Sequence, residues 1–187
     1  MSADDHVAAP PNPEEPFNDL LTYAELLNTP RLARLYIHIL RNGPVTIEAI
    51  KDALEMAHST TYKYVGHLEE MEVLTRHDEN PTTVTVVPIR LRIDADDGAV
   101  TATPALIDAI GRQTDTEDIR VFVERQGVPK LAAALHYARR IADGELTQRT
   151  ASNKLDVHPS EGMTVFTALR DVVEAAETYD PYLTQSE

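Results

Sequence analysis

The fold is set by residues 46–74, which read TIEAIKDALEMAHSTTYKYVGHLEEMEVL. The pattern predicts a short helix, a tight turn at Met56-Ala57-His58 and a longer helix that ends in an acidic run. Thr46 can cap the first helix, and Val45 can pack on Ile50 as a hydrophobic staple. Apolar residues then recur on one face of that helix: Ile47, Ile50 and Leu54.

The second helix of this stretch has two distinct faces, and we expect Ser59 to cap it. Its predicted inward side carries Thr61, Tyr64, Val65, Leu68 and Met71. Its predicted outward side carries Ser59, Thr60, Tyr62, Lys63 and His67. No acidic residue interrupts the helix before Glu69. A helix that presents hydroxyl, ammonium and imidazole groups from its N-terminal half suits the DNA major groove.

Residues 59–76, STTYKYVGHLEEMEVLTR, resemble the recognition helix and first wing strand of winged helix-turn-helix transcription regulators of the MarR-like, ArsR-like and TrmB-like kinds. The exit from the helix departs from the family pattern at Glu72, where those families usually have glycine. The resemblance covers roughly residues 30–93. It implies a DNA-binding winged helix, with the outward face of the second helix as its reading surface.

A β-hairpin is predicted directly after this helix, where residues 73–77 and a Thr/Val alternation at 83–87 flank a turn. This is the expected wing. Asp78 and Glu79 at its tip would face phosphates, so either the tip points away from DNA or only Arg76 and the threonine hydroxyls engage. A second alternating run at 89–93 and a turn at 94–98 predict a further strand pair that ends at Ala102.

Upstream of the quoted stretch we expect an acidic, proline-rich disordered tail over residues 1–17 and a short helix capped by Asn18. That helix is apolar nearly all round, so it either contacts a second copy of the chain or packs across its own domain. Thr29-Pro30 is a strong helix start, and Asn42-Gly43-Pro44 is the expected stop of the supporting helix.

Residues 103–187 are predicted to be helical. Helices are expected at 103–111, 116–126, 129–142, 147–154 and 159–178. The last three have the order of a second helix-turn-helix, with Gln148, Arg149, Ser160, Thr164 and Thr167 as its exposed polar groups. Because the last helix shows little positive charge, an interaction or dimerisation domain is the favoured interpretation.

The net charge of the chain is −14, which argues against binding to nucleic acid, but the charge is unevenly distributed. Residues 31–93 carry eight acids and eight Lys/Arg, so the acidic excess is absent from the candidate DNA-binding unit. Only four residues are Lys against thirteen Arg, and Cys and Trp are absent. This composition is similar to that of halophilic archaeal proteins. In strong salt, where the Debye length falls to about 3 Å, repulsion from DNA is screened.

Several classes of function find no support in the sequence. There is no glycine-rich phosphate loop, zinc-protease motif, serine-hydrolase motif or cysteine nucleophile, so we predict no enzyme. His58, His67 and His77 are not spaced for a zinc site, and we expect no metal and no cofactor. No apolar run has membrane-spanning length, which predicts a soluble, cytoplasmic protein. No pattern identifies a small-molecule effector.

We therefore expect a mainly α (α+β) protein: a winged helix-turn-helix with a β-hairpin wing over residues 18–102, followed by an all-helical domain over 103–187. The predicted function is a sequence-specific regulator of transcription that binds double-stranded DNA as a homodimer. Thr60, Tyr62, Lys63 and His67 would meet base edges, Ser59 would cap the helix and reach a phosphate, and Arg76 and Thr83 would flank the backbone. The alternative is a winged-helix protein-interaction module that binds no DNA.

Overall fold

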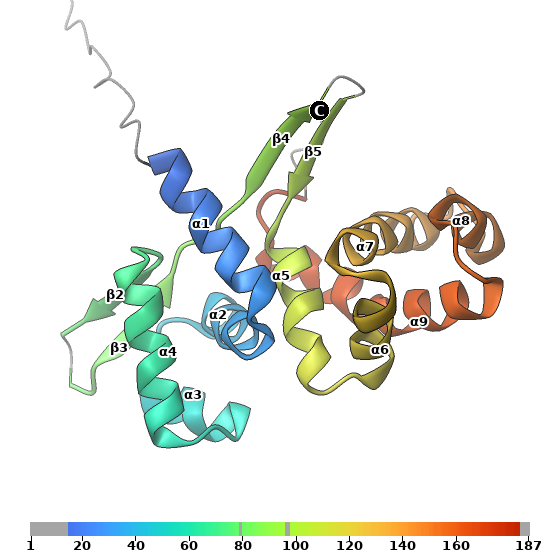
Figure 1. The fold of residues 1–187 in the computed structure, drawn as a ribbon. Coiled ribbons are helices and arrows are strands. Elements are labelled where there is room, and N and C mark those ends of the chain that lie inside the picture. Colours follow the sequence, from blue (N-terminus) through green and yellow to red (C-terminus); the bar gives the residue numbers. More distant parts are fainter. Residues whose placement is uncertain (1–14, 79, 96–97, 184–187) are drawn as a thin grey trace, which may run out of the picture.

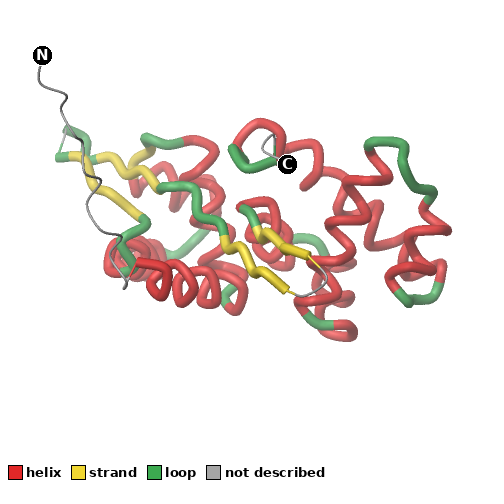
Figure 2. The backbone as a smooth tube through the Cα atoms, turned by 90° about the horizontal axis from the view of Figure 1, so that it is seen from above, coloured by secondary structure: helices red, strands yellow, loops and turns green. Residues whose placement is uncertain are grey.

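The structure, a computed structural model, describes residues 15–78, 80–95 and 98–183. The molecule is elongated (Figure 1). Seen from above, it has a small sheet toward one end and only helices toward the other (Figure 2). Most of the expected acidic tail, residues 1–14, lies outside the described residues. The described part is mainly helical with small antiparallel sheets, which confirms the predicted α+β class.

The N-terminal half has the element order of a winged helix. Its elements are α1 (Glu15–Asn28), α2 (Pro30–Asn42), β1 (Val45–Thr46), α3 (Ile47–Leu54), α4 (His58–Glu70), β2 (Leu74–His77) and β3 (Thr83–Val86). The strands form one antiparallel sheet in the order β1-β3-β2. The hairpin β2–β3 is the predicted wing. The sequence did not predict β1, whose two residues pair with Val84 and Thr83.

Helix starts were predicted with mixed success. Thr46 caps α3 as expected, because its Oγ1 accepts a hydrogen bond from the Ala49 amide at 3.2 Å. Pro30 opens α2, but Thr29 makes no side-chain cap bond. The expected Asn18 cap is wrong, since α1 already begins at Glu15 and Asn18 lies inside the helix.

A second hairpin connects the two halves. It consists of β4 (Leu91–Ala95) and β5 (Gly98–Ala102), which pair from Leu91–Ala102 to Ala95–Gly98. The sequence predicted this pairing, with the first strand two residues too early. The turn residues 96–97 lie outside the described residues.

The C-terminal half is helical, as predicted. Its elements are α5 (Pro104–Gly111), the 3₁₀ turn η1 (Arg112–Thr114), α6 (Glu117–Gln126), α7 (Val128–Ala142), α8 (Gln148–Leu155) and α9 (Pro159–Tyr179). Gly127 ends α6 with φ +83°, and Thr147 caps α8 through the Thr150 amide at 3.2 Å. α7, α8 and α9 form a compact three-helix unit.

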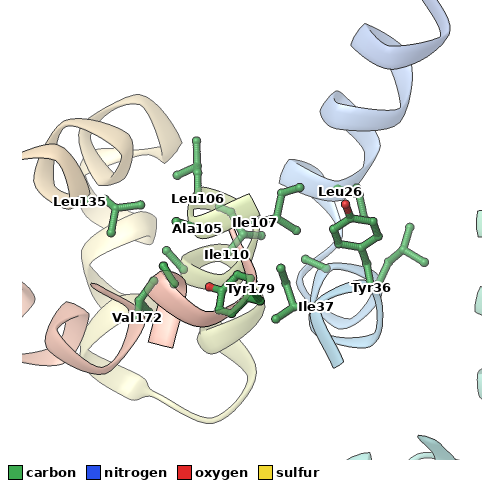
Figure 3. Packing of buried hydrophobic residues seen from close by; sticks show 14 of the residues in the cluster. Leu26, Tyr36, Ile37, Ala105, Leu106, Ile107, Ile110, Leu135, Val172 and Tyr179 are labelled. Atoms are coloured by element: carbon green, nitrogen blue, oxygen red, sulfur yellow. The ribbon is translucent and has the colours of Figure 1, made fainter. Parts of the chain in front are cut away.

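One hydrophobic core runs through both halves, across the domain boundary placed between residues 102 and 103. α5 lies between α2 and α9, and Ile37, Ile107 and Tyr179 meet in this region (Figure 3). Gly111 allows α5 to approach α2 closely, because a Cβ there would lie 2.9 Å from the Arg34 Cα.

Three buried tyrosines donate hydrogen bonds near this junction. Tyr23 donates to the Thr103 carbonyl at 2.8 Å and so joins the two halves. Tyr36 donates to the Val87 carbonyl at 2.7 Å within the first half, and Tyr179 donates to the buried Asp108 carboxylate at 2.8 Å within the second. Burial raises the pKa of all three phenols, so each stays a neutral donor. The shared core and the Tyr23 bond thus connect the N-terminal unit to the helices that follow it.

Candidate nucleic-acid interface

The two faces of α4 are separated as the sequence predicted. Thr61, Val65 and Leu68 are buried, and Tyr64 and Met71 are partly buried against the core. The Thr61 hydroxyl is satisfied within the helix, since it donates to the Ala57 carbonyl at 3.1 Å. The opposite face is open to solvent, so α4 is seated on its apolar side and presents its polar side.

The N-terminal half of this outward face is free of acids. Ser59, Tyr62 and Lys63 are exposed, and Thr60 is partly exposed. Tyr62 keeps 45% of its surface accessible, although its ring stacks on His58 with the ring centroids 4.4 Å apart. None of the described residues forms an ion pair with Lys63. These groups are available to an external partner.

The predicted role of Ser59 as helix cap is wrong. α4 begins at His58, two residues earlier than a Ser59 cap implies, and its N-cap is Ala57, which has no side chain able to accept a hydrogen bond. Ser59 thus lies in the first turn of the helix with its hydroxyl exposed. The first amides of a helix lack intrahelical partners and attract anions, so Ser59 stands where a phosphate would approach.

Arg31 is a candidate contact that the sequence reasoning missed. It is exposed near the start of α2 and lines an open hollow of about 310 Å³ together with Thr60. None of the described acids forms an ion pair with it. Its position two residues after a predicted helix start was visible in the sequence, but only the fold brings it beside α4.

The C-terminal half of α4 is less open to an anionic partner. The His67 imidazole lies between two carboxylates, 3.6 Å from Glu25 of α1 and 3.8 Å from Glu70. Arg76 of β2 donates to Glu69 at 2.8 Å. Both predicted contact residues are therefore engaged by acids of the same chain, and each would have to leave them to reach DNA.

The wing has fewer groups available to contact DNA than the sequence predicted. The Oγ1 of Thr83 is buried and has no hydrogen-bond partner among the described residues, which corrects its predicted place beside the DNA backbone. The Thr85 hydroxyl is bonded to His77 at 2.8 Å. Asp78 is exposed near the tip, while Glu79 lies outside the described residues.

Cations of α2 face the C-terminal helices. Arg34 forms an ion pair with Asp115 at 3.4 Å, and the Arg41 guanidinium lies 5.4 Å from the centre of the Tyr179 ring. His38 lies with these two arginines along a second hollow, which is distinct from the one beside Thr60. Burial lowers the pKa of His38, and the charges of Arg34 and Arg41 lower it further. This side of α2 therefore contributes to the junction between the halves.

Within the described part of the chain, no group of three or more His, Asp and Glu side chains is placed to hold a metal ion. In the same residues, no helix has the length and apolarity needed to cross a membrane.

The two halves of the chain match two different family models. Residues 21–90 match the model of the sugar-specific transcriptional regulator TrmB, and residues 113–178 match a family of unknown function (DUF7437). No curated protein and no solved structure gives a significant match to the chain. The first match begins within α1 and ends just before β4. The N-terminal unit is thus similar to a TrmB domain in sequence and has the element order of a winged helix.

Proposed function

We propose that the protein is a sequence-specific regulator of transcription that binds double-stranded DNA, with α4 in the major groove. One observation supports this most strongly. The exposed N-terminal half of α4 carries hydroxyl and ammonium groups without a single acid, within a unit that resembles TrmB. A major groove admits an α-helix, and such groups match the acceptors and donors of base edges.

We rank the predicted contact residues by their accessibility and by their ion pairs. Thr60, Tyr62 and Lys63 are the base-edge contacts, because all three are accessible near the start of α4. Ser59 and Arg31 are the phosphate contacts. His67 and Arg76 contribute less, since DNA must first displace their carboxylate partners.

The acidity of the chain fits this proposal if binding takes place in strong salt, as the composition suggests. At high ionic strength the gain from counterion release is small, so affinity depends on hydrogen bonds and nonpolar contact. The exposed ring of Tyr62 supplies nonpolar surface of this kind.

A homodimer is part of the proposal, and α1 supplies its interface. Phe17 and Leu21 are each 68% exposed, and Leu20 is also exposed beside them. These positions fall on one side of a helix, so they form a continuous apolar strip. Pairing two copies through this strip would remove it from water and present two α4 helices to DNA half-sites.

Replacing Lys63 tests the reading surface. Lys63→Ala removes an exposed amine that forms no ion pair or hydrogen bond with any described residue, so the circular dichroism spectrum is expected to stay unchanged. Loss of a good bidentate base contact costs roughly 1–3 kcal/mol of discrimination. The specific mobility shift on duplexes selected from a random pool should therefore disappear.

Arg125→Ala is the matched control, because it likewise removes one exposed cation that forms no ion pair with a described residue, from α6 in the C-terminal half. It should leave the specific shift intact. A Lys63→Ala protein that binds selected duplexes as tightly as the parent would refute the assignment and favour the protein-interaction module instead.

The dimer is tested separately. Phe17→Asp combined with Leu21→Asp should convert a species of twice the chain mass to one of the chain mass, as measured by light scattering after gel filtration. Neither residue is buried within the described chain, so the fold should persist. A mass that does not change would exclude α1 as the interface.

A further inference from the structure

The helix pair α8–α9 repeats the geometry of α3–α4, with each position found 101 residues later in the chain, from Thr46 to Thr147 and from Leu54 to Leu155. Both short helices span eight residues and are capped by a threonine hydroxyl that accepts an amide hydrogen bond at 3.2 Å. The second pair therefore starts in the same way as the first.

The turn between the helices is also repeated. Glu55 leaves α3 in the left-handed region with φ 51° and ψ 41°, and Asp156 leaves α8 with φ 55° and ψ 54°. Ala57 enters α4 with φ −61° and ψ 141°, and His158 enters α9 with φ −59° and ψ 139°. The torsions at the first and last residues of the turn thus agree in the two pairs, and the helix lengths and caps agree as well, so we regard α8–α9 as a second helix-turn-helix.

The outward side of α9 matches that of α4 in kind. Its N-terminal half exposes Ser160, Met163, Thr164 and Thr167. Met163 is 52% exposed and occupies the position that Tyr62 has in α4, so each helix presents one large apolar side chain there. The nearby acid, Glu161, is partly buried and accepts a hydrogen bond from Gln126 at 3.3 Å.

The charge of this unit differs from that of its surroundings. Residues 128–179 carry six Lys/Arg and seven Asp/Glu, a net of −1, whereas residues 94–127 carry three and eight, a net of −5. Several cations of the unit form no ion pair with any described residue: Arg139, Arg149, Lys154 and Arg170. Arg149 stands where the first unit has the acidic Glu48. Unpaired cations beside a polar helix face complement a polyanion.

We propose that the unit α7–α9 is a second DNA-binding module, which inserts the N-terminal half of α9 into the major groove and sets Arg149 and Lys154 against phosphates. The module lies at the opposite end of the molecule from α4 (Figures 1 and 2), so one chain contacts double-stranded DNA at two separate places. This inference goes beyond the proposed role of α4 and does not require it. DNA is favoured over a protein partner because Arg149 and Lys154 are exposed and form no ion pair with any described residue.

The test places a negative charge on the presented face of α9. Thr164→Glu is compared with Thr178→Glu on the same helix; both threonines are exposed, and each donates its hydroxyl to a backbone carbonyl of the helix. The full-length proteins are titrated, over a range of KCl concentrations, into a labelled pool of random-sequence duplexes, and circular dichroism checks that both remain folded.

We expect Thr164→Glu to weaken binding to the pool by about tenfold, as carboxylates repel phosphates at close range, and Thr178→Glu to have little effect. The paired change Arg149→Gln and Lys154→Gln should reduce the slope of log affinity against log salt by about 1.8, which corresponds to two phosphate contacts. Equal affinities for Thr164→Glu and Thr178→Glu would overturn the proposal and leave α9 as a protein-binding surface.

Lys63→Ala, measured on the selected duplexes as well as on the random pool, separates this inference from the role of α4. If Lys63→Ala binds the selected duplexes as tightly as the parent while Thr164→Glu binds the pool more weakly than Thr178→Glu, α9 is the DNA-binding helix and the inference stands alone. If Lys63→Ala loses the selected duplexes while Thr164→Glu and Thr178→Glu bind the pool equally, α4 is the DNA-binding helix and the second module is refuted.

Discussion

The two helix-turn-helix units share a backbone but differ in what surrounds it. In the first unit, β1, β2 and β3 pack beside the helices, and the cations of α3 and the wing are paired with acids, as in Lys51–Glu48 and Arg76–Glu69. In the second unit, α6 packs on α9 instead. Arg140 is paired with Glu145, but Arg149 and Lys154 form no ion pair with any described residue. Cap residues and one left-handed turn residue are thus enough to build the motif, while its surface chemistry is set independently.

The units also differ at the point where the two helices of the motif touch. α4 accommodates the buried Thr61 at this crossing, whereas α9 has Gly162 at the same position. A Cβ on Gly162 would lie 2.8 Å from the Cβ of Ser152 in α8. The second pair is therefore packed more tightly than the first, and this difference leads to the largest predicted effect.

Gly162→Ala should lower the free energy of unfolding by about 1–3 kcal/mol, because the added methyl overpacks the crossing of α8 and α9. Urea denaturation measures the change. Thr61→Ala is the matched variant of the first unit. It removes side-chain atoms from the crossing of α3 and α4, whereas Gly162→Ala adds a methyl group to the crossing of α8 and α9.

A double-variant cycle identifies the cause. If the clash with Ser152 is responsible, Gly162→Ala combined with Ser152→Gly should lose less stability than the two single changes added together. Additive losses would show that the crossing tolerates a methyl group and that the cost arises elsewhere.

The caps provide the next comparison, with an expected loss of about 1 kcal/mol for each unit. Thr46→Ala and Thr147→Ala each remove a hydroxyl that accepts an amide hydrogen bond at 3.2 Å. Thr29→Ala is the control, since Thr29 precedes α2 but makes no cap bond. Thermal or urea unfolding should show equal losses of stability for Thr46→Ala and Thr147→Ala and almost none for Thr29→Ala. Unequal losses at Thr46 and Thr147 would show that the two caps do not stabilise their helices equally.

The motif was predictable because its signals are local. A capping threonine, helical spacing of apolar residues and a short turn lie within a few residues of one another, and they identified α3–α4, the wing and the order of α7–α9. Helix ends were less certain, as Ser59 and Asn18 show, because several polar residues near a start can each serve as cap. The residues matched by the TrmB model agree with the resemblance drawn from residues 59–76.

Features that depend on distant residues were not predictable. β1 is two residues long and exists only because Val84 and Thr83 pair with it. The ion pair of His67 with Glu25 joins α4 to α1, which are far apart in the sequence, so this contact could not be predicted. The partners Glu70 of His67 and Glu69 of Arg76 lie close in the sequence. The burial of the Thr83 hydroxyl likewise depends on the packed sheet.

A smaller difference lies on the outward faces of α4 and α9, where Gly66 corresponds to Thr167. A Cβ on Gly66 would meet nothing within 4 Å, so Gly66→Ala should stabilise the fold by roughly 0.5–1 kcal/mol. If DNA approaches this turn of α4, the same change should weaken specific binding, since the methyl occupies the space between helix and duplex. Urea denaturation and a mobility shift on selected duplexes measure the two effects; tighter or unchanged binding would place the duplex farther from Gly66.

The smallest effect concerns the junction between the halves, where His38 shares a hollow with Arg34, Arg41, Asp108, Arg112 and Asp115. Burial and the two neighbouring arginines lower the pKa of His38, so the folded protein keeps this imidazole neutral at a pH where the unfolded chain already binds a proton. The contribution of His38 to stability is therefore complete above the ordinary histidine pKa of about 6.5 and is lost as the pH falls below it.

Urea unfolding at about pH 7.5 and at about pH 5.5 tests this. The free energy of unfolding should fall more between these two pH values in the parent than in His38→Gln, which lacks the titrating group. Other groups, such as His136, whose pKa is also lowered by burial, act alike in both proteins and cancel in the difference. Equal losses in the two proteins would mean that His38 is protonated as easily in the fold as in the unfolded chain, and that α5 does not shield this side of α2.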